Sequence, residues 1–493
     1  MKAFAEAVKE TPVLYDVDVA VIGGGAAGIG AALAAGRNGA KTVLVERYSN
    51  LGGTQTLTYN NSFSFVDDRI QGGLIKEIWE DLIKAGATYQ STEGQGRARW
   101  TEKEGCFFFD YEYYKTYLDR KMAESGVTVL YHTYAVGGFS EGASLKGVLV
   151  ESIEGRFAIL AKSVIDCTGL AELAWKAGAD VVGEEGFGDN RYGNYKGSHF
   201  GYGYGSYLVG LNYEKFREFA KANPEQWNSW VKGTDLIAKC KADGSLYYEK
   251  NGMVNNEYED GRVWLLGPGH GIGKGEQPYA PHLLSAACMD LRKQAWSIRD
   301  MMQKHVPGCE GIEVEQTPPR LFMRDVHRLA GEYELTEHDM YNSREFEDSV
   351  VCSNMPPDIF FPDGKHHSRA FDVAPYDVPY RSLISKSFDN LLAAGSSGSY
   401  DIMVWCALRY CTPSVCTGQA AGTAAALAGK MGVTPKKLDV TVLQNELKKS
   451  GLITSTRDVP RNVMEEYCEK GVAFRGAYKL NQVRCCQFER CKH

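Results

Sequence analysis

The sequence predicts an α/β protein with a doubly wound parallel sheet, into which a smaller α+β domain is inserted. Three observations support this fold class. A glycine-rich turn near residue 23 lies between an apolar run and a helical run; strand-like and helix-like segments alternate up to residue 182; and this alternation returns after residue 315. Alternating strands and helices are typical of a parallel sheet covered by helices on both faces.

The first elements form a β-turn-α-β unit. Residues 17–22 are mostly β-branched and predict a buried strand, residues 26–38 predict an alanine-rich helix, and residues 42–46 predict a second strand. Apolar residues at helical spacing then predict two amphipathic helices, over residues 72–87 and 110–126. This order is the one that builds parallel sheets.

The later elements extend the same pattern. Residues 127–140 and 147–169 predict strands joined by hairpin turns. The stretch RLFMRDVHRLAG, residues 320–331, has helix-like spacing, residues 390–395 predict a strand, and residues 412–430 predict a final helix.

A change in amino-acid composition along the chain suggests where its domains divide. Residues 183–315 are richer in Gly, Tyr and Trp and alternate less clearly than the flanking regions. We therefore expect residues 1–182 and 316–450 to be two parts of one domain, residues 183–315 to be an inserted cap or substrate domain, and residues 451–493 to be a C-terminal tail.

Composition excludes several classes of protein. The 493 residues are 44% apolar and 24% charged, with a formal net charge of −7, which does not suggest a basic surface for nucleic acid or membrane. No run approaches 18 apolar residues, and the first residues lack the apolar region of a secretory signal, so we expect a cytoplasmic protein without a membrane span. The tail cluster Cys485, Cys486, Cys491 and His493 fits no standard ligand spacing, and we expect no metal site.

The glycine-rich turn has the spacing of a dinucleotide-binding loop. Gly23 permits a tight turn, Gly25 lets a phosphate approach the backbone, and Gly28 lets the helix pack closely on the strand. The free N–H groups at the helix start, near Ala26 and Ala27, would then bind the pyrophosphate. The alternative is a tight turn without a ligand.

An acidic residue at the end of the second strand supports the nucleotide interpretation. Glu46 follows the strand directly, where a carboxylate can accept hydrogen bonds from the ribose hydroxyls, and Arg47 comes next. An acid at this place favours adenosine with a free 2′-hydroxyl over a 2′-phosphate.

Three further features favour FAD over NAD. The segment LGGT, residues 51–54, offers a second stretch of bare backbone; VIDCTG, residues 164–169, predicts a strand that ends at a glycine; and the last helix contains GQAAG, residues 418–422. Thr412 and Pro413 suit the N-cap and first position of this helix, whose positive end would face the flavin. Each interior glycine costs about 1 kcal/mol relative to alanine, so something must approach the helix closely. The alternative is that this helix has small residues only because it packs on the sheet. The helix can also do both, packing on the sheet and facing the flavin.

Taken in order, these motifs resemble the FAD-dependent oxidoreductase family of bacterial and archaeal flavoproteins. That family is distantly similar to the flavoprotein subunit of fumarate reductases and to the flavin subunit of heterodisulfide reductase. The resemblance covers roughly residues 17–182 and 317–445 and implies a Rossmann-like FAD-binding domain. By position, it implies that FAD is bound by Gly23, Gly25, Ala26, Ala27, Gly28, Glu46, Arg47, Gly52, Gly53, Thr54, Gly169, Gly395, Gly418 and Gln419.

The chain also departs from the family pattern near the expected flavin. Ser396 and Ser397 stand where the family usually has Arg-Cys, and Ile402 and Met403 stand where a His-Glu pair commonly follows. Residues 170–172 read Leu-Ala-Glu where relatives often have Asp-Gly-Asp. These differences suggest a substrate unlike that of typical relatives.

Candidate catalytic groups are arginines and histidines. Arg324 and Arg328 would share a face of the helix expected over 320–331, resemble family arginines, and could bind a substrate carboxylate or deliver a proton. Ion pairing with nearby acids is the alternative. Arg409 matches a family arginine close to the flavin. The full catalytic set that we expect is Arg324, Arg328, Arg409, His327 and His270.

The favoured function is an FAD-dependent oxidoreductase that transfers a hydride between flavin and a small organic substrate, at a C–C, C–O or C–N bond. One alternative is a subunit that holds FAD and passes electrons to a protein partner. A disulfide reductase that uses a pyridine nucleotide is less well supported, because among the 13 cysteines no CxxC pair occurs. The sequence leaves open whether the chain forms a homo-oligomer.

Overall fold

The computed structural model describes residues 10–89, 105–186, 197–227, 231–324, 327–360, 366–368 and 373–467. The tail cluster of Cys485, Cys486, Cys491 and His493 lies outside these ranges.

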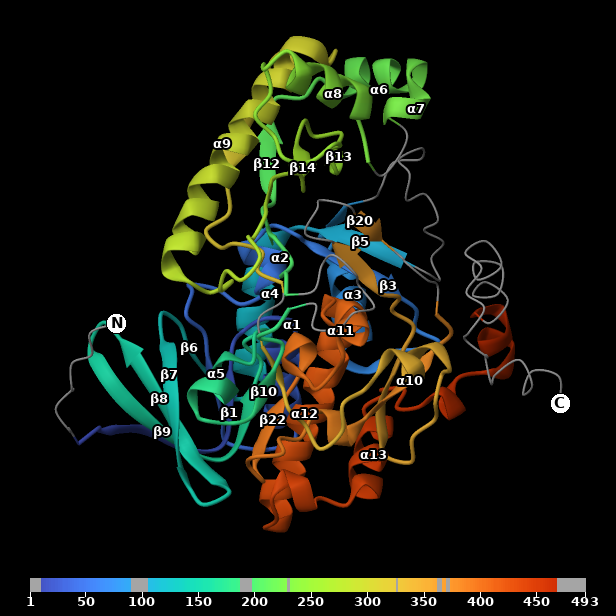
Figure 1. Cartoon of the computed structure of the whole chain (residues 1–493). Coiled ribbons are helices and arrows are strands. Elements are labelled where there is room, and N and C mark those ends of the chain that lie inside the picture. The colour runs from blue at the N-terminus through green and yellow to red at the C-terminus, as the bar shows by residue number, and fades with distance from the viewer. Residues whose placement is uncertain are drawn as a thin grey trace.

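A central sheet organises the larger part of the molecule (Figure 1). Its parallel part has the order β6 (Val127–Leu130), β2 (Thr42–Val45), β1 (Val13–Ile22), β9 (Gly155–Asp166) and β22 (Leu391–Ala393). Only the last three residues of β9 pair with β22; the first part of β9 pairs antiparallel with β8 (Ser144–Ser152), which in turn pairs with β7 (Tyr134–Glu141). Because β22 joins the sheet, segments more than 200 residues apart form one unit.

Both faces of β2, of β22 and of the second half of β1 are largely buried, which explains their nearly unbroken apolar sequence. Along β1, Val19 and Val21 belong to a core cluster on one face, whereas Ala20 and Ile22 belong to a second cluster on the other. The first cluster includes residues of the helices that cover the sheet, among them α1 (Ala26–Arg37) and α12 (Cys411–Met431). The second packs against β8 and α5 (Glu172–Lys176).

Two long helices pack against each other on the sheet. Helix α1 (Ala26–Arg37) follows β1, and α12 (Cys411–Met431) lies along it. A Cβ added to Gly418 would lie only 2.0 Å from the carbonyl oxygen of Ala27. The small residues of α12 therefore allow the two helix backbones to approach closely. Helices α3 (Gly73–Lys84), α4 (Tyr111–Glu124) and α13 (Val440–Lys449) pack around this pair.

Residues within the predicted inserted segment form a second sheet with helices of its own, at the top of Figure 1. The sheet is antiparallel, in the order β13 (Asn255–Glu257), β14 (Val263–Leu265), β12 (Ser206–Val209) and β16 (Glu313–Gln316). Its helices are α6 (Tyr213–Ala222), α7 (Pro224–Trp227), α8 (Thr234–Ala242) and α9 (Pro281–His305). A separate apolar cluster joins the sheet to these helices. The boundaries at residues 183 and 315 stay a prediction.

The helix expected over residues 320–331 is wrong. Phe322 bridges Gly203, and β17 (Arg328–Leu329) pairs with β10 (Val181–Val182), so the described residues here are extended. These backbone pairings with distant strands override the local helical spacing. Arg324 and Arg328 therefore share no helix face.

The start of the last long helix also differs from the prediction. Its N-cap is Tyr410 rather than Thr412, and Pro413 lies inside the first turn, where its missing N–H removes no helical hydrogen bond.

The remaining described elements complete the chain. They are α2 (Thr54–Leu57), β3 (Ser62–Val66), β4 (Thr88–Tyr89), β5 (Gly105–Phe109), β11 (Tyr202–Gly203), β15 (Gly269–His270), α10 (Glu337–Tyr341), β18 (Ser349–Ser353), β19 (Asp358–Phe360), β20 (His366–Ser368), β21 (Tyr376–Pro379) and α11 (Ile402–Leu408), with short 3₁₀ turns at 380–382, 395–397, 435–437 and 456–458.

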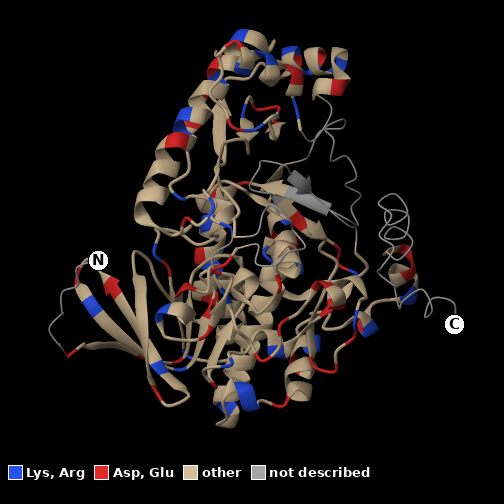
Figure 2. Ribbon diagram, in the orientation of Figure 1, with Lys and Arg blue, Asp and Glu red and all other residues tan. Residues whose placement is uncertain are grey.

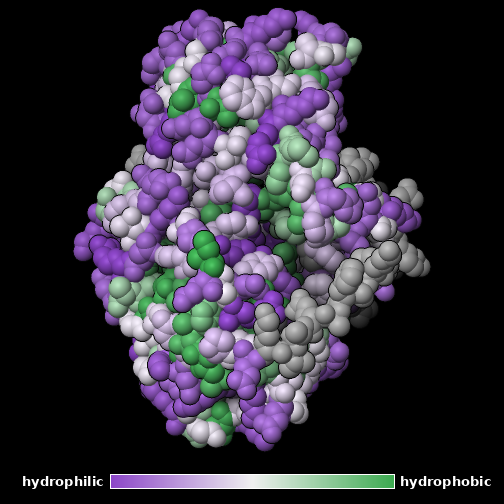
Figure 3. Space-filling model, turned by 90° about the vertical axis from the view of Figure 1, so that its left-hand side faces the viewer, coloured by the Kyte–Doolittle hydropathy of each residue, from purple (hydrophilic) through white to green (hydrophobic). Residues whose placement is uncertain are grey.

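Charges of both signs are interspersed over the described elements (Figure 2), and hydrophilic side chains cover most of the upper part of the face in Figure 3. Among the helices that the structure describes, none combines the length and the apolar character needed to cross a bilayer. Eight cysteines whose side chains the structure describes are free thiols, and six of them are buried, as expected for small apolar side chains.

Candidate functional site

A long cavity lies at the carboxyl ends of the parallel strands. Its empty space, counted together with the part that is open to solvent, is about 870 Å³, and residues that follow β1, β2, β9 and β22 line it. This edge of an open α/β sheet is where such folds bind ligands. Eleven of the sequence-predicted site residues lie along its wall: Gly23, Gly25, Ala26, Ala27, Glu46, Arg47, Gly53, Thr54, Gly169, Arg324 and Arg409.

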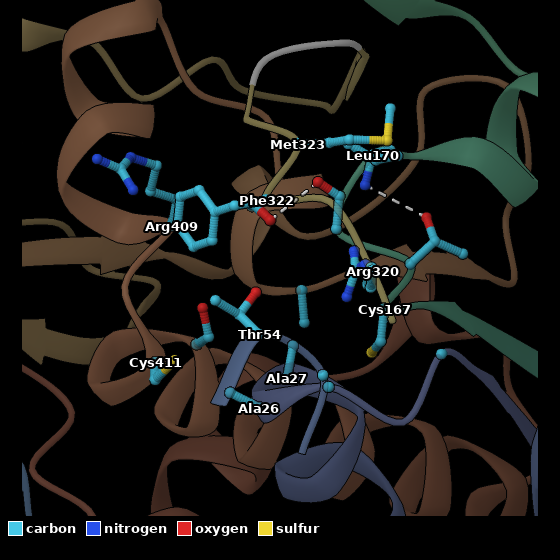
Figure 4. A pocket seen from close by; sticks show the side chains of 18 of the residues that line it. Ala26, Ala27, Thr54, Cys167, Leu170, Arg320, Phe322, Met323, Arg409 and Cys411 are labelled. Carbon is cyan, nitrogen blue, oxygen red and sulfur yellow. Dashed lines mark hydrogen bonds between the residues drawn. The ribbon is translucent and has the colours of Figure 1, made fainter. Parts of the chain in front are cut away.

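Bare backbone forms the floor of the cavity. Gly25 is the N-cap of α1, and no side chain caps the helix, so the N–H groups of its first turn are available to a ligand. The LGGT loop lies opposite: a Cβ added to Gly53 would lie 2.8 Å from the Cα of Gly25. Figure 4 shows Ala26, Ala27 and Thr54 along this floor. The arrangement fits a pyrophosphate.

Glu46 lies where the sequence places the ribose-binding acid. Its Oε2 accepts a hydrogen bond from the backbone N–H of Gly24 at 2.7 Å, and Oε1 accepts one from Tyr48 at 2.9 Å. Each carboxylate oxygen has a further lone pair for a ribose hydroxyl. The neighbouring Arg47 forms an ion pair with Glu172 and lies 4.6 Å above the ring of Tyr134.

A second uncapped helix N-terminus borders the cavity. Helix α12 begins at Cys411, its N-cap Tyr410 makes no side-chain cap, and Cys411 and Ser414 line the cavity. Trp405 and Arg409 lie beside them, from α11 and its C-cap. Figure 4 shows Arg409 and Cys411 on one side of the cavity and Cys167 on the other. Positive partial charge at this helix end favours negative charge on a ligand.

Two cavity-lining arginines have different electrostatic surroundings. Arg409 forms a buried ion pair with Asp358, with Nη2 3.1 Å from Oδ2, and also donates to the Asp358 carbonyl. Arg324, 8% exposed, donates from Nη1 to the carbonyl of Gly201 at 2.8 Å. Burial, and then repulsion by Arg409, lower the pKa of Arg324 to about 9.

Three of the predicted catalytic residues are not among those that line the cavity. Arg328 is buried and donates from Nε to the carbonyl of Tyr400 at 3.0 Å. His327 lies 3.3 Å from a carboxylate oxygen of Glu184 and stacks on Trp175. His270 pairs with Asp290, with Nδ1 2.7 Å from Oδ2. Catalytic roles for these three stay a prediction.

Five predicted cofactor residues also lie behind the cavity wall. Gly28 packs against Gly23, where an added Cβ would lie 1.8 Å from the carbonyl oxygen. Gly52 donates to the carbonyl of Gly24 at 2.9 Å, and Gly395 donates to the Thr417 hydroxyl at 3.0 Å.

The last two of these residues are in α12. Gly418 packs on α1, whereas the Gln419 side chain accepts from the N–H of Leu74 and donates to Ser450. Contacts between FAD and any of these five residues stay a prediction.

Further residues, for which the sequence predicts no contact with FAD, line the same cavity. Arg320 faces the cavity beside Gly53 and Cys167 (Figure 4), and burial lowers the pKa of its guanidinium. Its only sequence signal was its place in a cluster of arginines. The other additions are Tyr48, Cys167, Thr168, Leu170, Phe322, Met323, Ala394, Ser396, Trp405, Cys411 and Ser414.

Comparisons with known proteins give one family and a set of distant structures. The model of the FAD dependent oxidoreductase family matches residues 18–447. A search of the curated proteins finds no match. Among solved structures, the chain is similar to a geranylgeranyl bacteriochlorophyll reductase-like protein from Thermoplasma acidophilum, with 11% identity and a TM-score of 0.48 over 94% of this chain and 99% of that one. It is also similar to p-nitrophenol 4-monooxygenase from Pseudomonas putida, with 12% identity and a TM-score of 0.47 over 97% and 99%.

Proposed function

Because the chain belongs to the FAD-dependent oxidoreductase family and is an FAD-dependent enzyme, we propose that it transfers a hydride between FAD and a small organic substrate. The substrate bond that is oxidised or reduced is C–C, C–O or C–N. The observation that supports this most is a single cavity that two uncapped helix N-termini border. The N-terminus of α1 suits the pyrophosphate, and the N-terminus of α12 suits the flavin ring.

The proposed cofactor site follows the cavity from Glu46 to Arg409. Glu46 binds the adenosine ribose, the backbone around Gly25 and Gly53 binds the pyrophosphate, and the start of α12 meets the flavin. We assign this site to a domain made of residues 1–182 and 316–450. Residues 183–315 form the cap, and the substrate binds between the two.

The protein groups that act on the substrate lie at the flavin end. Bound FAD supplies a two-electron acceptor or donor. Arg324 reaches the cavity from the segment that bridges to β11, where its guanidinium orients the substrate, and the ion pair with Asp358 fixes Arg409 beside Trp405. A group on the cap side transfers the proton. The candidate is His270, whose ring the Asp290 carboxylate holds in place.

Purification and a visible spectrum test this function directly. The purified protein is expected to carry FAD, and after anaerobic photoreduction a suitable oxidised substrate is expected to reoxidise the flavin without any protein partner. A colourless protein that gains no stability from added FAD would contradict the cofactor site, because a ligand that binds only the folded state must stabilise it.

A second candidate function is an FAD-holding electron-transfer subunit. Its supporting observation is that Ile402 and Met403, at the place where the family commonly has His-Glu, are buried in the core and offer no group for proton transfer. Reoxidation of the photoreduced flavin only by an added redox protein, and by no small molecule, would favour this candidate.

A further inference from the structure

Three apolar side chains line one side of the cavity, and we call them the apolar wall. Leu170 follows β9, and Phe322 and Met323 belong to the segment that bridges to β11. Figure 4 shows these three residues on one side of the cavity, with Ala26 and Ala27 of the floor on the other. The cavity therefore has an apolar wall across from its floor of bare backbone.

The apolar wall leaves apolar surface uncovered. All three side chains are only half-buried. Leu170 and Phe322 belong to none of the hydrophobic clusters that the described residues form. Covering apolar surface is favourable by about 25 cal/mol per Å². A ligand with an apolar group therefore gains affinity when it covers this wall.

Local contacts hold the apolar wall in place. The N–H of Phe322 donates to the carbonyl of Gly203 at 3.0 Å, and the Phe322 carbonyl accepts from the Gly203 N–H at 3.1 Å. The guanidinium of Arg324 lies 4.4 Å from the centre of the Phe322 ring. The N–H of Leu170 donates to the Thr168 hydroxyl at 3.4 Å. A wall that is already ordered loses little conformational freedom when a ligand binds.

Two of the three wall residues are joined to the proposed cap. Phe322 bridges β11, and Met323 packs against a cluster that includes Tyr202 of β11 and Leu291 of α9. Both elements lie within residues 183–315, whereas the floor comes from α1 and the LGGT loop. Because the proposed FAD site follows the floor and the substrate binds between FAD and the cap, the substrate is the ligand that meets the wall.

The charged residues of the cavity restrict the substrate further. Glu46 is the one acid among the described residues that line it, and the proposed function assigns Glu46 to the adenosine ribose. Leu170 stands where relatives often have Asp. The lining therefore offers no carboxylate to a substrate amine, which disfavours a cationic substrate.

We propose that the apolar wall binds an aromatic ring or a hydrocarbon segment of the substrate. This inference rests on the proposed function and names its substrate class, a compound with an apolar group rather than a sugar or an amine. Apolar side chains make up much of the wall in most small-molecule sites, and the few polar groups orient the ligand.

Calorimetric titration of the FAD-loaded protein with 2-naphthol, 1-octanol and glucose tests this substrate class. At least one of the two apolar probes is expected to bind, and glucose is expected not to bind. Leu170→Asn, which replaces apolar surface by an amide of similar size, is expected to weaken the binding of that probe about tenfold or more. Leu170→Met stays apolar and is expected to retain most of the affinity.

A second variant and a matched control accompany this experiment. Met323→Gln makes the same change of polarity at another position of the wall and is expected to weaken binding in the same direction. Ile153 is fully exposed in the turn between β8 and β9, so Ile153→Asn is expected to bind the probe like the wild type.

FAD titration of the apo protein separates the apolar wall from the cofactor site. Leu170→Asn is expected to bind FAD as tightly as the wild type, because FAD follows the floor. Weaker FAD binding by this variant would place the wall against the cofactor and overturn the proposal. The proposal is also overturned if neither apolar probe binds better than glucose, or if both wall variants bind the probe like the wild type. Failure of the wild-type apo protein to bind FAD contradicts the proposed function itself.

Discussion

Gly25 and Gly53 meet backbone to backbone at the floor of the cavity, yet the two positions are not equivalent. A Cβ on Gly53 would lie 2.8 Å from the Cα of Gly25, whereas a Cβ on Gly25 would meet only the Cα of Gly53, at 3.9 Å. Gly25 also has an extended conformation, with φ −75°, that alanine can adopt. The protein alone therefore does not require glycine at position 25, which leaves a ligand as the reason for it.

The first prediction follows from this difference. Gly25→Ala is expected to fold with a loss of about 1 kcal/mol or less, the scale of an N-cap change, because its methyl group points into the cavity. The same methyl group takes space that a phosphate needs, so FAD affinity is expected to fall about tenfold or more, equivalent to about 1.4 kcal/mol. Fluorescence titration of the apo protein with FAD and thermal melts measure the two effects.

Gly28→Ala is the matched control for this prediction. Its Cβ would lie 1.8 Å from the carbonyl oxygen of Gly23, so the apo protein itself is expected to lose about 1–3 kcal/mol or more through overpacking. Unchanged FAD affinity in Gly25→Ala would show that no phosphate approaches the backbone there.

The second prediction concerns the glycines of α12. Gly418→Ala would place a Cβ 2.0 Å from the carbonyl oxygen of Ala27 and is expected to destabilise the apo protein by about 1–3 kcal/mol. Gly429, in the same helix, has no neighbour within 4 Å, so Gly429→Ala is expected to stabilise the protein by up to about 1 kcal/mol. Urea unfolding of both variants without FAD checks this contrast. Equal stability of the two variants would contradict close packing of α12 on α1.

The sequence could predict the β1–α1–β2 unit because its signals are local. The apolar run of β1, the glycine spacing and Glu46 at the end of β2 all lie within 30 residues, and the structure places them as that spacing implies. The glycines of α12 also indicated that another part of the molecule or a ligand lies close to the backbone of this helix. No local pattern could show that this neighbour is α1, because the contact joins residues nearly 400 positions apart.

The secondary structure of the segment around Arg324 could not be predicted from local sequence patterns. Its helical spacing is real, but its backbone pairs with Gly203 and Val182, more than 100 residues away. The sequence of the segment does not reveal which distant strands it pairs with. Here this long-range pairing outweighs the intrinsic helix preference of the segment.

The third prediction is that Glu172 contributes to the free energy of unfolding and that this contribution is lost in acid. Burial alone would raise the pKa of this carboxyl group, but Arg47, Lys176 and Tyr134 outweigh burial and hold it at about 2, against 4.5 for an unperturbed glutamate. Because the pKa is lower in the folded state, the stabilisation is complete above pH 4.5 and is lost as the pH falls toward 2. The full effect is about 3 kcal/mol at most.

Urea unfolding of the wild type and Glu172→Gln at pH 7 and pH 3 measures this contribution. The variant is expected to be less stable at pH 7, because Arg47 loses its partner, and the difference between the two proteins is expected to shrink at pH 3. A difference that stays constant over this range would assign the acid sensitivity of the protein to other carboxylates, such as Glu77, whose pKa is also lowered to about 2.

The fourth prediction assigns Arg320 to the cofactor. Its guanidinium lies beside Gly53, and no described residue forms a hydrogen bond or ion pair with it, while burial lowers its pKa. A cation held in this way stabilises the fold little but attracts the doubly charged pyrophosphate strongly. Arg320→Met is therefore expected to weaken FAD binding about tenfold or more and to leave the apo melting temperature unchanged or higher. The exposed Arg292 of α9 gives the control Arg292→Met, which is expected to bind FAD like the wild type. If Arg320→Met also keeps wild-type affinity, even at low salt where charge attraction is strongest, the pyrophosphate cannot lie between Gly25 and Gly53.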